Sequence, residues 1–285
     1  MLIQTKMPTT TLAAIMAAST LLFSAPIQGS PVRRDHSPQA GFVGRVVHSI
    51  TLPTTGANNN NLKASYDDVV EVTTSITIDN TDLASLAGWF PNLVLVTENV
   101  LITNNRDLAS TDGSFQHLET VSGYVDISGN LELTNLGSAF PFPGGARLVT
   151  GYLNVYNNPA LTSLDSAFHG LVKITGYCSI YANPRLTTLG TAFAGLQAVT
   201  GYLGVHSNPR LTTLGKLAFS SLQTVEGYVS VYANPALASL GGAFSKLQTV
   251  TGYFVVANNP NLACSATEAV GGNAVQTGSC VPDPV

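Results

Sequence analysis

A segment of 25 residues that recurs along the chain limits what this sequence can fold into. GYLNVYNNPALTSLDSAFHGLVKIT, residues 151–175, is followed directly by GYCSIYANPRLTTLGTAFAGLQAVT, residues 176–200. Further copies begin at Gly201, Gly227 and Gly252, with one single-residue insertion, and degenerate copies begin near residues 74, 98 and 123. Self-similarity of this kind is typical of a solenoid, in which each repeat packs only against its neighbours.

The start of each copy has the pattern of a β-strand with one buried face. Leu153 and Val155 alternate with Tyr152, Asn154 and Tyr156, and side chains two apart in a strand lie on the same face. Three residues after the second inward position, each copy from residue 123 onward has an asparagine: Asn130, Asn158, Asn183, Asn208, Asn234 and Asn259. Asparagines stacked in this way can bond to their own turn and to the next coil. We therefore predict a structural Asn column here, not a ligand site.

The residues after the strand of each copy predict tight turns, which form the corners of the coil. Proline follows the asparagine in five copies and ends the strand, because it lacks an N–H. Apolar residues then recur at steps of three, which suits short 3₁₀ turns, and one phenylalanine per copy predicts an internal Phe column. The predicted fold is a right-handed parallel β-helix, or leucine-rich-repeat-like coil, with one main parallel sheet and short 3₁₀ or helical corners. PFPGGAR (Pro141–Arg147) predicts an inserted loop, a place where solenoids often carry binding contacts.

The two ends of the sequence predict that the protein is secreted and that the solenoid is capped at both ends. Residues 1–29 have a basic start and a short apolar run, as in a secretory signal peptide. We expect a leader and N-terminal cap at residues 30–73, the repeat solenoid at 74–264, and a C-terminal cap or tail at 265–285. In an exported protein with three cysteines, we expect a disulfide between Cys264 and Cys280, whereas Cys178 falls in an inward column and predicts a buried free thiol.

The spaced pattern F-x-x-L-x-x-V-x-G-Y-L-x-V-x-x-N-x-x-L, over about residues 74–264, resembles the repeat of receptor L domains. DISGNLELTNL (Asp126–Leu136) and VVANNPNLAC (Val255–Cys264) are the nearest matches. Receptor L domains are leucine-rich, β-helix-like ligand-binding modules of epidermal-growth-factor and insulin receptor ectodomains, and fungal cell-wall proteins have similar repeats. The resemblance implies an extracellular binding or adhesion role. The sequence departs from the receptors because it has no cysteine-rich module, membrane span or kinase, so we do not expect a signalling receptor.

Composition and motifs argue against several other classes. Charged residues make up 10% of the chain, the net charge is −4, and no Lys/Arg stripe is present, so nucleic acid is a poor partner. The five histidines are scattered, which predicts no metal site, and we expect no cofactor. Parallel β-helices do include polysaccharide-degrading enzymes, which need two converging carboxylates. Asp126 and Asp165 are candidates, but we find no convincing pair and predict that the chain is not an enzyme.

The outward positions of the strands predict an aromatic surface. What we call the first Tyr row is Tyr124, Tyr152, Tyr177, Tyr202, Tyr228 and Tyr253. The second Tyr row is Tyr156, Tyr181, His206 and Tyr232, flanked by Ser128 and Ala257. Between them lies a polar floor of Asp126, Asn154, Ser179, Gly204 and Ser230. Rings with hydroxyl tips can contact sugars or a protein partner. A self-stacking ladder that stiffens the sheet is the alternative, which we favour for the first row; the second is the better binding candidate.

A strip of hydroxyl groups marks another side of the predicted coil. It comprises Thr134, Thr162, Thr187 and Thr212, beside Ser163, Thr188, Thr213 and Ser239. Threonine arrays on some antifreeze solenoids bind ice, but here the threonines are adjacent and Ala238 interrupts them. We expect these side chains to fill a corner.

Taken as a sequence, the chain predicts a secreted recognition module that binds extracellular polysaccharide or a cell-surface protein, free or associated with a wall or matrix. The predicted binding residues are Tyr152, Asn154, Tyr156, Tyr177, Ser179, Tyr181, Tyr202, His206, Tyr228 and Tyr232. A structural wall or matrix protein, or an adhesin, is the alternative. An enzyme or an ice-binding protein is less favoured.

Overall fold

The computed structural model describes residues 44–57, 60–263 and 275–277, the last three by backbone alone. All belong to one compact unit, residues 43–285. The predicted signal peptide and the cysteines of the predicted disulfide, Cys264 and Cys280, lie outside the described residues.

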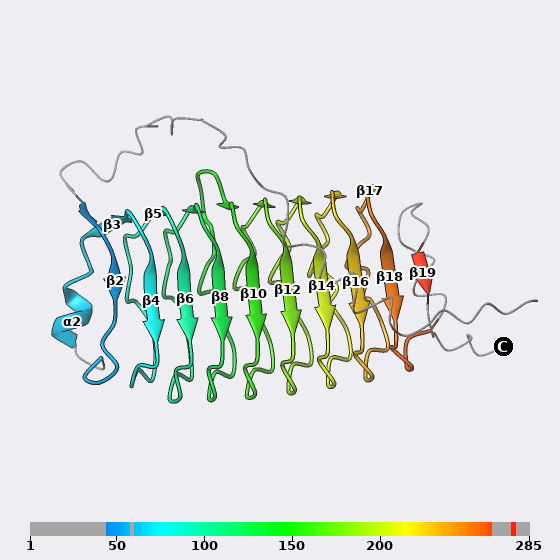
Figure 1. Cartoon of the computed structure of the whole chain (residues 1–285), viewed down its shortest axis with the longest axis horizontal. Helices are drawn as coiled ribbons and strands as arrows, with labels where there is room; N and C mark the ends of the chain where they lie inside the picture. Colours follow the sequence, from blue (N-terminus) through cyan, green and yellow to red (C-terminus); the bar gives the residue numbers. More distant parts are fainter. Residues whose placement is uncertain (1–43, 58–59, 264–274, 278–285) are drawn as a thin grey trace, which may run out of the picture. The chain divides into compact units, whose positions relative to one another are not determined.

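The described chain is a parallel β-solenoid, as the repeat predicts (Figure 1). Its larger sheet has ten parallel strands and contains the four-residue strand of each copy. In sheet order these strands are β19 (Val275–Thr277), β18 (Phe254–Ala257), β16 (Val229–Tyr232), β14 (Leu203–His206), β12 (Cys178–Tyr181), β10 (Leu153–Tyr156), β8 (Val125–Ser128), β6 (Val100–Thr103), β4 (Ile76–Asp79) and β2 (Ile50–Thr51). Equivalent residues of successive copies pair directly, as Leu153 does with Cys178 and Cys178 with Leu203.

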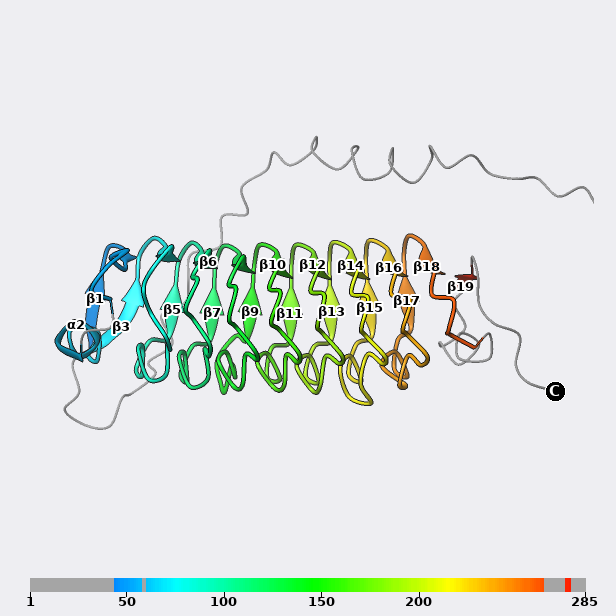
Figure 2. The same cartoon turned by 90° about the horizontal axis from the view of Figure 1, so that it is seen from below.

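A second parallel sheet of nine strands was not predicted (Figure 2). It contains β1 (Arg45–Val47), β3 (Val69–Val72), β5 (Leu95–Val96), β7 (Thr120–Val121), β9 (Leu148–Val149), β11 (Lys173–Ile174), β13 (Ala198–Val199), β15 (Thr224–Val225) and β17 (Thr249–Val250). The expectation of one main sheet is therefore corrected. Most of these strands have two residues, too few for an alternating pattern to appear in the sequence.

The corners between the sheets are tight turns. They contain the predicted single turns with the i to i−3 bonds of 3₁₀ geometry, such as Ala167 N to Leu164 O at 3.1 Å and Leu171 N to Phe168 O at 3.0 Å. None of these turns continues into a 3₁₀ helix in the described chain. Isolated bridges such as Ser163 to Thr188 join the coils on this side. The bonds run mainly between coils, so no turn is extended into a helix.

The first coil starts earlier than we expected. β1, β2 and β3 lie in the region that we predicted to be a leader, and they continue both sheets. The one described helix, α2 (Asn60–Ala64), lies at the N-terminal end of the stack (Figure 1). Leu62 and Tyr66 pack against the hydrophobic core there. The described part of the predicted leader is thus largely a coil of the solenoid.

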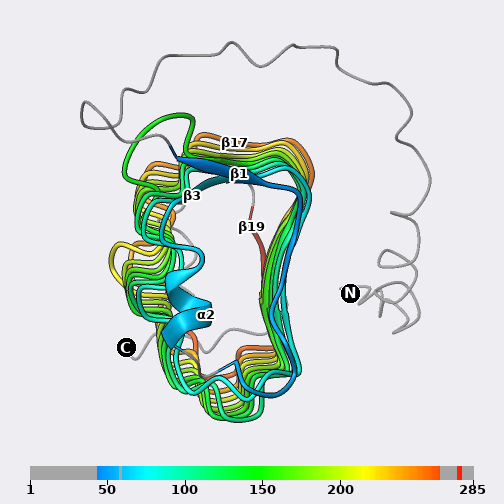
Figure 3. The same ribbon diagram turned by 90° about the vertical axis from the view of Figure 1, so that its left-hand side faces the viewer.

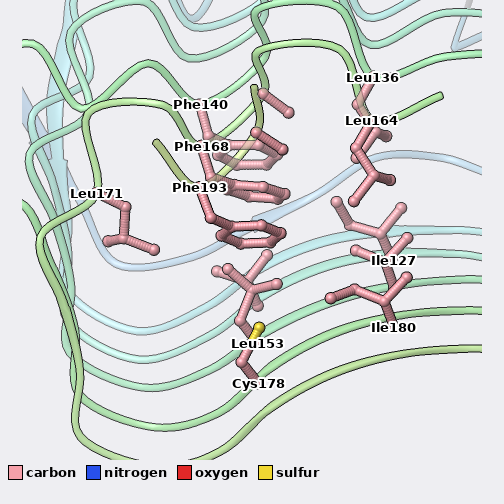
Figure 4. Packing of buried hydrophobic residues seen from close by; sticks show 14 of the residues in the cluster. Ile127, Leu136, Phe140, Leu153, Leu164, Phe168, Leu171, Cys178, Ile180 and Phe193 are labelled. Carbon is pink, nitrogen blue, oxygen red and sulfur yellow. The ribbon is translucent and has the colours of Figure 1, made fainter. Parts of the chain in front are cut away.

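Apolar columns fill the interior. Figure 3 shows the coils superposed when viewed along the stack. Phe168, Phe193 and their equivalents stack with ring centroids 4.6–5.6 Å apart from Phe90 to Phe244, and Figure 4 shows the central part of this Phe column. The inserted loop, green in Figure 3, is anchored by Phe142, which is fully buried. Cys178 is a buried free thiol, as predicted.

The Asn column forms a continuous chain of hydrogen bonds. Asn183 Oδ1 accepts from the backbone N–H of Asn158 at 3.1 Å, and Asn208 Oδ1 accepts from that of Asn183 at 3.0 Å. The side-chain amide of Asn183 donates to Val155 O and Tyr181 O, both at 3.0 Å. The predicted structural role is therefore confirmed.

Candidate functional site

The first Tyr row lies beside the ten-stranded sheet as a stack of rings. From Tyr124 to Tyr228, successive ring centroids are 4.3–4.9 Å apart and the planes differ by 4–11°. The glycine before each ring allows the coils to approach: a Cβ on Gly201 would lie 2.6 Å from the carbonyl oxygen of Gly176. Tyr253, at the C-terminal end of the row, is 59% exposed.

The second Tyr row is also stacked. Tyr156, Tyr181, His206 and Tyr232 have centroid separations of 4.7, 4.9 and 4.6 Å in that order. Each residue ends a strand of the ten-stranded sheet, where Tyr156 pairs with Ser128 and Tyr232 with Ala257. Because these two neighbours lack rings, one face of the first and last ring is not covered by another described ring.

Stacking determines which parts of the Tyr rows are accessible to a ligand. Rings within a row cover each other's faces, which leaves edges and hydroxyl groups for contact with a partner. The self-stacking that we considered as an alternative is thus present in both rows. The faces best placed to stack on a ligand are the outer faces of Tyr156 and Tyr232.

The polar floor is less accessible than we expected. Its residues are in register across the strands, but Asp126 and Asn154 are each only 8% exposed, and Ser179 is 2% exposed. Asp126 accepts a hydrogen bond from Ser128 Oγ at 2.6 Å. A ligand on this face would meet the rings before Asn154 or Ser179. Sequence alternation places these residues on the outer face but cannot show how small their exposed fraction is.

Burial raises the pKa of Tyr181 to about 12 and also raises the pKa values of Tyr152 and Tyr202. Tyrosine hydroxyls are protonated at neutral pH even at their ordinary pKa of about 10, so burial extends this neutral state to more alkaline pH. The hydroxyl groups can both donate and accept hydrogen bonds. Burial also raises the pKa of Asp126, while the Ser128 hydrogen bond opposes that shift.

His206 lies between two tyrosines as a neutral ring. Desolvation lowers its pKa from 6.5 to about 4. The unfolded chain therefore binds a proton at higher pH than the folded chain, and stability decreases as pH falls from about 6.5 to about 4. We expect a loss of about 1–2 kcal/mol, since solvent around the partly exposed ring screens some of the difference.

Chemical denaturation at several pH values tests this expectation. H206Y is the matched control, because it preserves a stacked ring and removes the titrating group. The wild-type chain should lose stability relative to H206Y between pH 6.5 and pH 4. A constant difference between the two proteins over this range would contradict the assignment.

The hydroxyl strip has an internal role. Thr162 Oγ1 donates to Thr134 O at 3.0 Å, Thr187 Oγ1 to Thr162 O at 3.0 Å, and Thr212 Oγ1 to Thr187 O at 3.2 Å. Each exposed threonine thus joins its coil to the preceding one. This bonding fits the predicted corner-filling role and engages the hydroxyl protons of these threonines within the protein. The hydroxyl oxygens of the neighbouring members of the strip instead accept hydrogen bonds from the backbone N–H two residues on: Ser163, Thr188, Thr213 and Ser239.

The described residues contain no group of three or more His, Cys, Asp or Glu side chains placed to hold a metal ion. No helix in this part of the chain is long and apolar enough to cross a membrane. Two shallow hollows occur at the corner after the ten-stranded sheet, lined by Leu131, Pro159 and Pro184 among others. Our sequence reasoning treated these prolines only as strand terminators.

No family model matches this chain, and no curated protein or solved structure matches it significantly.

Proposed function

We propose that the protein is an extracellular recognition module without catalytic activity, and that its two Tyr rows bind an extended polysaccharide. The observation that carries this proposal is the regular spacing of the second Tyr row, with ring centroids 4.6–4.9 Å apart. This spacing is close to the length of one sugar unit, so successive sugars could contact successive coils. The resemblance to receptor L domains supports an extracellular binding role, and the apolar N-terminal segment supports secretion.

The expected contacts follow from the ring geometry. Protonated tyrosine hydroxyls along the rows would exchange hydrogen bonds with sugar hydroxyls. The open faces of Tyr156 and Tyr232 would stack on the apolar faces of sugar rings. Because the rows are already ordered by stacking, binding would cost little side-chain entropy.

A glycan array on the secreted protein, followed by affinity measurements on the retained glycan, tests the proposal. Y156A/Y181A/Y232A should weaken binding by about 30-fold or more, as expected when central aromatic contacts worth about 2 kcal/mol are removed. Y156F/Y181F/Y232F separates two contributions, because it preserves the rings and removes only the hydroxyls.

The control is K173A, an exposed position on the nine-stranded sheet, which should bind like the wild type. Thermal unfolding should show that the triple variants remain folded. An array that retains no glycan, or unchanged affinity of the triple alanine variant, would contradict the proposal.

A cell-surface protein is the other ligand class that this face would suit. Ring edges with hydroxyl tips are common at protein interfaces, where one end is buried and the other remains hydrated. The same variants distinguish this case. The wild-type protein would then capture a surface protein but bind no glycan, and the alanine variant would no longer capture that surface protein.

A structural wall or matrix role is the second candidate function, and the self-stacking of both rows favours it. In that case the rings stiffen the sheet and have no ligand. Y156A/Y181A/Y232A would then lower stability, yet would remain associated with the wall or matrix like the wild type.

A further inference from the structure

A column of charged side chains follows the corner after the ten-stranded sheet. The Asn column defines it. Asn105 extends this column by one coil, because its backbone N–H donates to Asn130 Oδ1 at 3.1 Å, and the same bond joins each asparagine to the next as far as Asn208. The five asparagines in register are Asn105, Asn130, Asn158, Asn183 and Asn208. The residue two positions after each of these asparagines gives what we call the corner charge column: Asp107, Glu132, Ala160, Arg185 and Arg210. All four charged residues are exposed.

The order of charge along this column is antisymmetric. Two acidic residues precede Ala160 and two basic residues follow it. Glu132 and Arg185 are two coils apart, or about 10 Å at the usual strand spacing, which is too far for a direct ion pair. None of the four charged side chains forms an ion pair with another described residue.

Apolar side chains lie next to the column. Leu131 is 48% exposed, which is unusual for a leucine in this protein. It lines both shallow hollows with Pro159 and Pro184, and Arg185 and Glu132 also line one of them. The surface therefore combines an apolar strip with Glu132 near one end and Arg185 and Arg210 near the other. Arg106, also exposed, directly precedes Asp107, so the negative charge at the first end is carried mainly by Glu132.

We propose that this corner binds a second copy of the chain, with the two solenoids antiparallel. The two-fold axis would lie in the interface, perpendicular to the direction of coil stacking, at the level of Ala160. Such a pair is self-complementary: each Glu132 faces the partner's Arg185, and each Asp107 faces the partner's Arg210. Leu131 of one copy then lies opposite the partner's Pro184.

The charge order selects this arrangement over its alternatives. In a parallel pair each charged residue would face the same residue of the partner, so that Glu132 would oppose the partner's Glu132. A small anion would use only the two arginines and leave the acidic half unpaired. The antiparallel pair uses all four charged positions of both copies.

Because exposed ion pairs are weak and screened by salt, the association should be weak and salt-sensitive. Sedimentation velocity of the full chain at low ionic strength should show a monomer–dimer equilibrium that shifts toward monomer as salt is added. In E132R the new arginine faces the partner's Arg185, and the two-fold axis repeats this repulsive contact, so the dimer contains it twice. The substitution should raise the dissociation constant at least about tenfold. R185E should do the same with two acidic residues.

The double variant E132R/R185E is the decisive control. It exchanges the two charges and restores both opposing pairs, so its dissociation constant should return to within about threefold of the wild-type value. Unchanged thermal unfolding of each variant would show that these exposed substitutions leave the fold intact.

Four results would overturn the proposal. A wild-type chain that stays monomeric at every concentration and at low salt would exclude the dimer. Association that E132R does not weaken would place the contact elsewhere, for example at the ends of the coil stack. Recovery that fails in the double variant, or inorganic phosphate binding enhanced by E132R without any dimer, would show that the two charges do not face each other.

Discussion

Replacing Asn183 with alanine is expected to lower the free energy of unfolding by about 3–5 kcal/mol. The side chain is fully buried and makes three hydrogen bonds to the backbone: it donates to Val155 O and Tyr181 O and accepts from the N–H of Asn158. Alanine removes all three in a site closed to water, and a lost bond of this kind costs about 1–3 kcal/mol. A urea titration measures the effect.

Asn259 provides a matched control at the end of the same column. Its side chain donates to Val231 O and accepts from the N–H of Asn234. N259A therefore removes two backbone bonds at a terminal coil, and we expect a smaller loss than for N183A. N183D should also be destabilising, because a carboxylate cannot donate to the two carbonyl groups. A loss below about 1 kcal/mol for N183A would contradict the role we assign to the column.

Replacing Phe193 with alanine should cost about 3–5 kcal/mol, the usual range for a large side chain in a core. Its ring is fully buried and stacks on Phe168 at a centroid distance of 5.3 Å (Figure 4). On its other face it stacks on Phe219 at 5.1 Å. Neighbouring coils are joined by strand pairing, so they cannot collapse fully into the cavity. F193L, which fills much of the volume, should cost less than half as much.

Leu217 serves as the control for this substitution, since it is 46% exposed and its replacement by alanine should change stability by less than about 0.5 kcal/mol. Because each coil contacts only its neighbours, the cavity in F193A should also weaken coupling between the two halves of the stack. Denaturation in two steps would be direct evidence of that weakening. A single transition with an unchanged midpoint would contradict the prediction.

The inward columns could be predicted because the repeat has a nearly constant length. Once Leu153 is aligned with Cys178 and Leu203, every other inward position follows, and the Asn column confirms the register. The second sheet could not be found in this way, since two-residue strands such as β11 have no periodicity. The first coil was missed because residues 45–72 include α2 where the later copies have tight turns.

The candidate site was predicted in part. Alternation along the strands gave both Tyr rows and the polar floor, but it contains no information on ring orientation. The near-parallel rings and the burial of Asn154 depend on side-chain rotamers and on the glycine contacts that bring the coils together. The residues of the corner charge column can be identified in the sequence, two positions after the asparagines from Asn105 to Asn208. Its antisymmetry has meaning only when the coils are known to be stacked.

The positions of the aromatic side chains allow spectroscopy to follow two regions of the molecule separately. The chain has one tryptophan, Trp89, which lies near Tyr66 and Phe90 at the N-terminal end, with ring centroids 6.3 and 6.2 Å away. The stacked tyrosines belong to later coils. Indole fluorescence therefore reports on opening of the N-terminal end, whereas near-ultraviolet dichroism of the tyrosines reports on the centre. Comparing the two signals during unfolding would show from which end the coils separate.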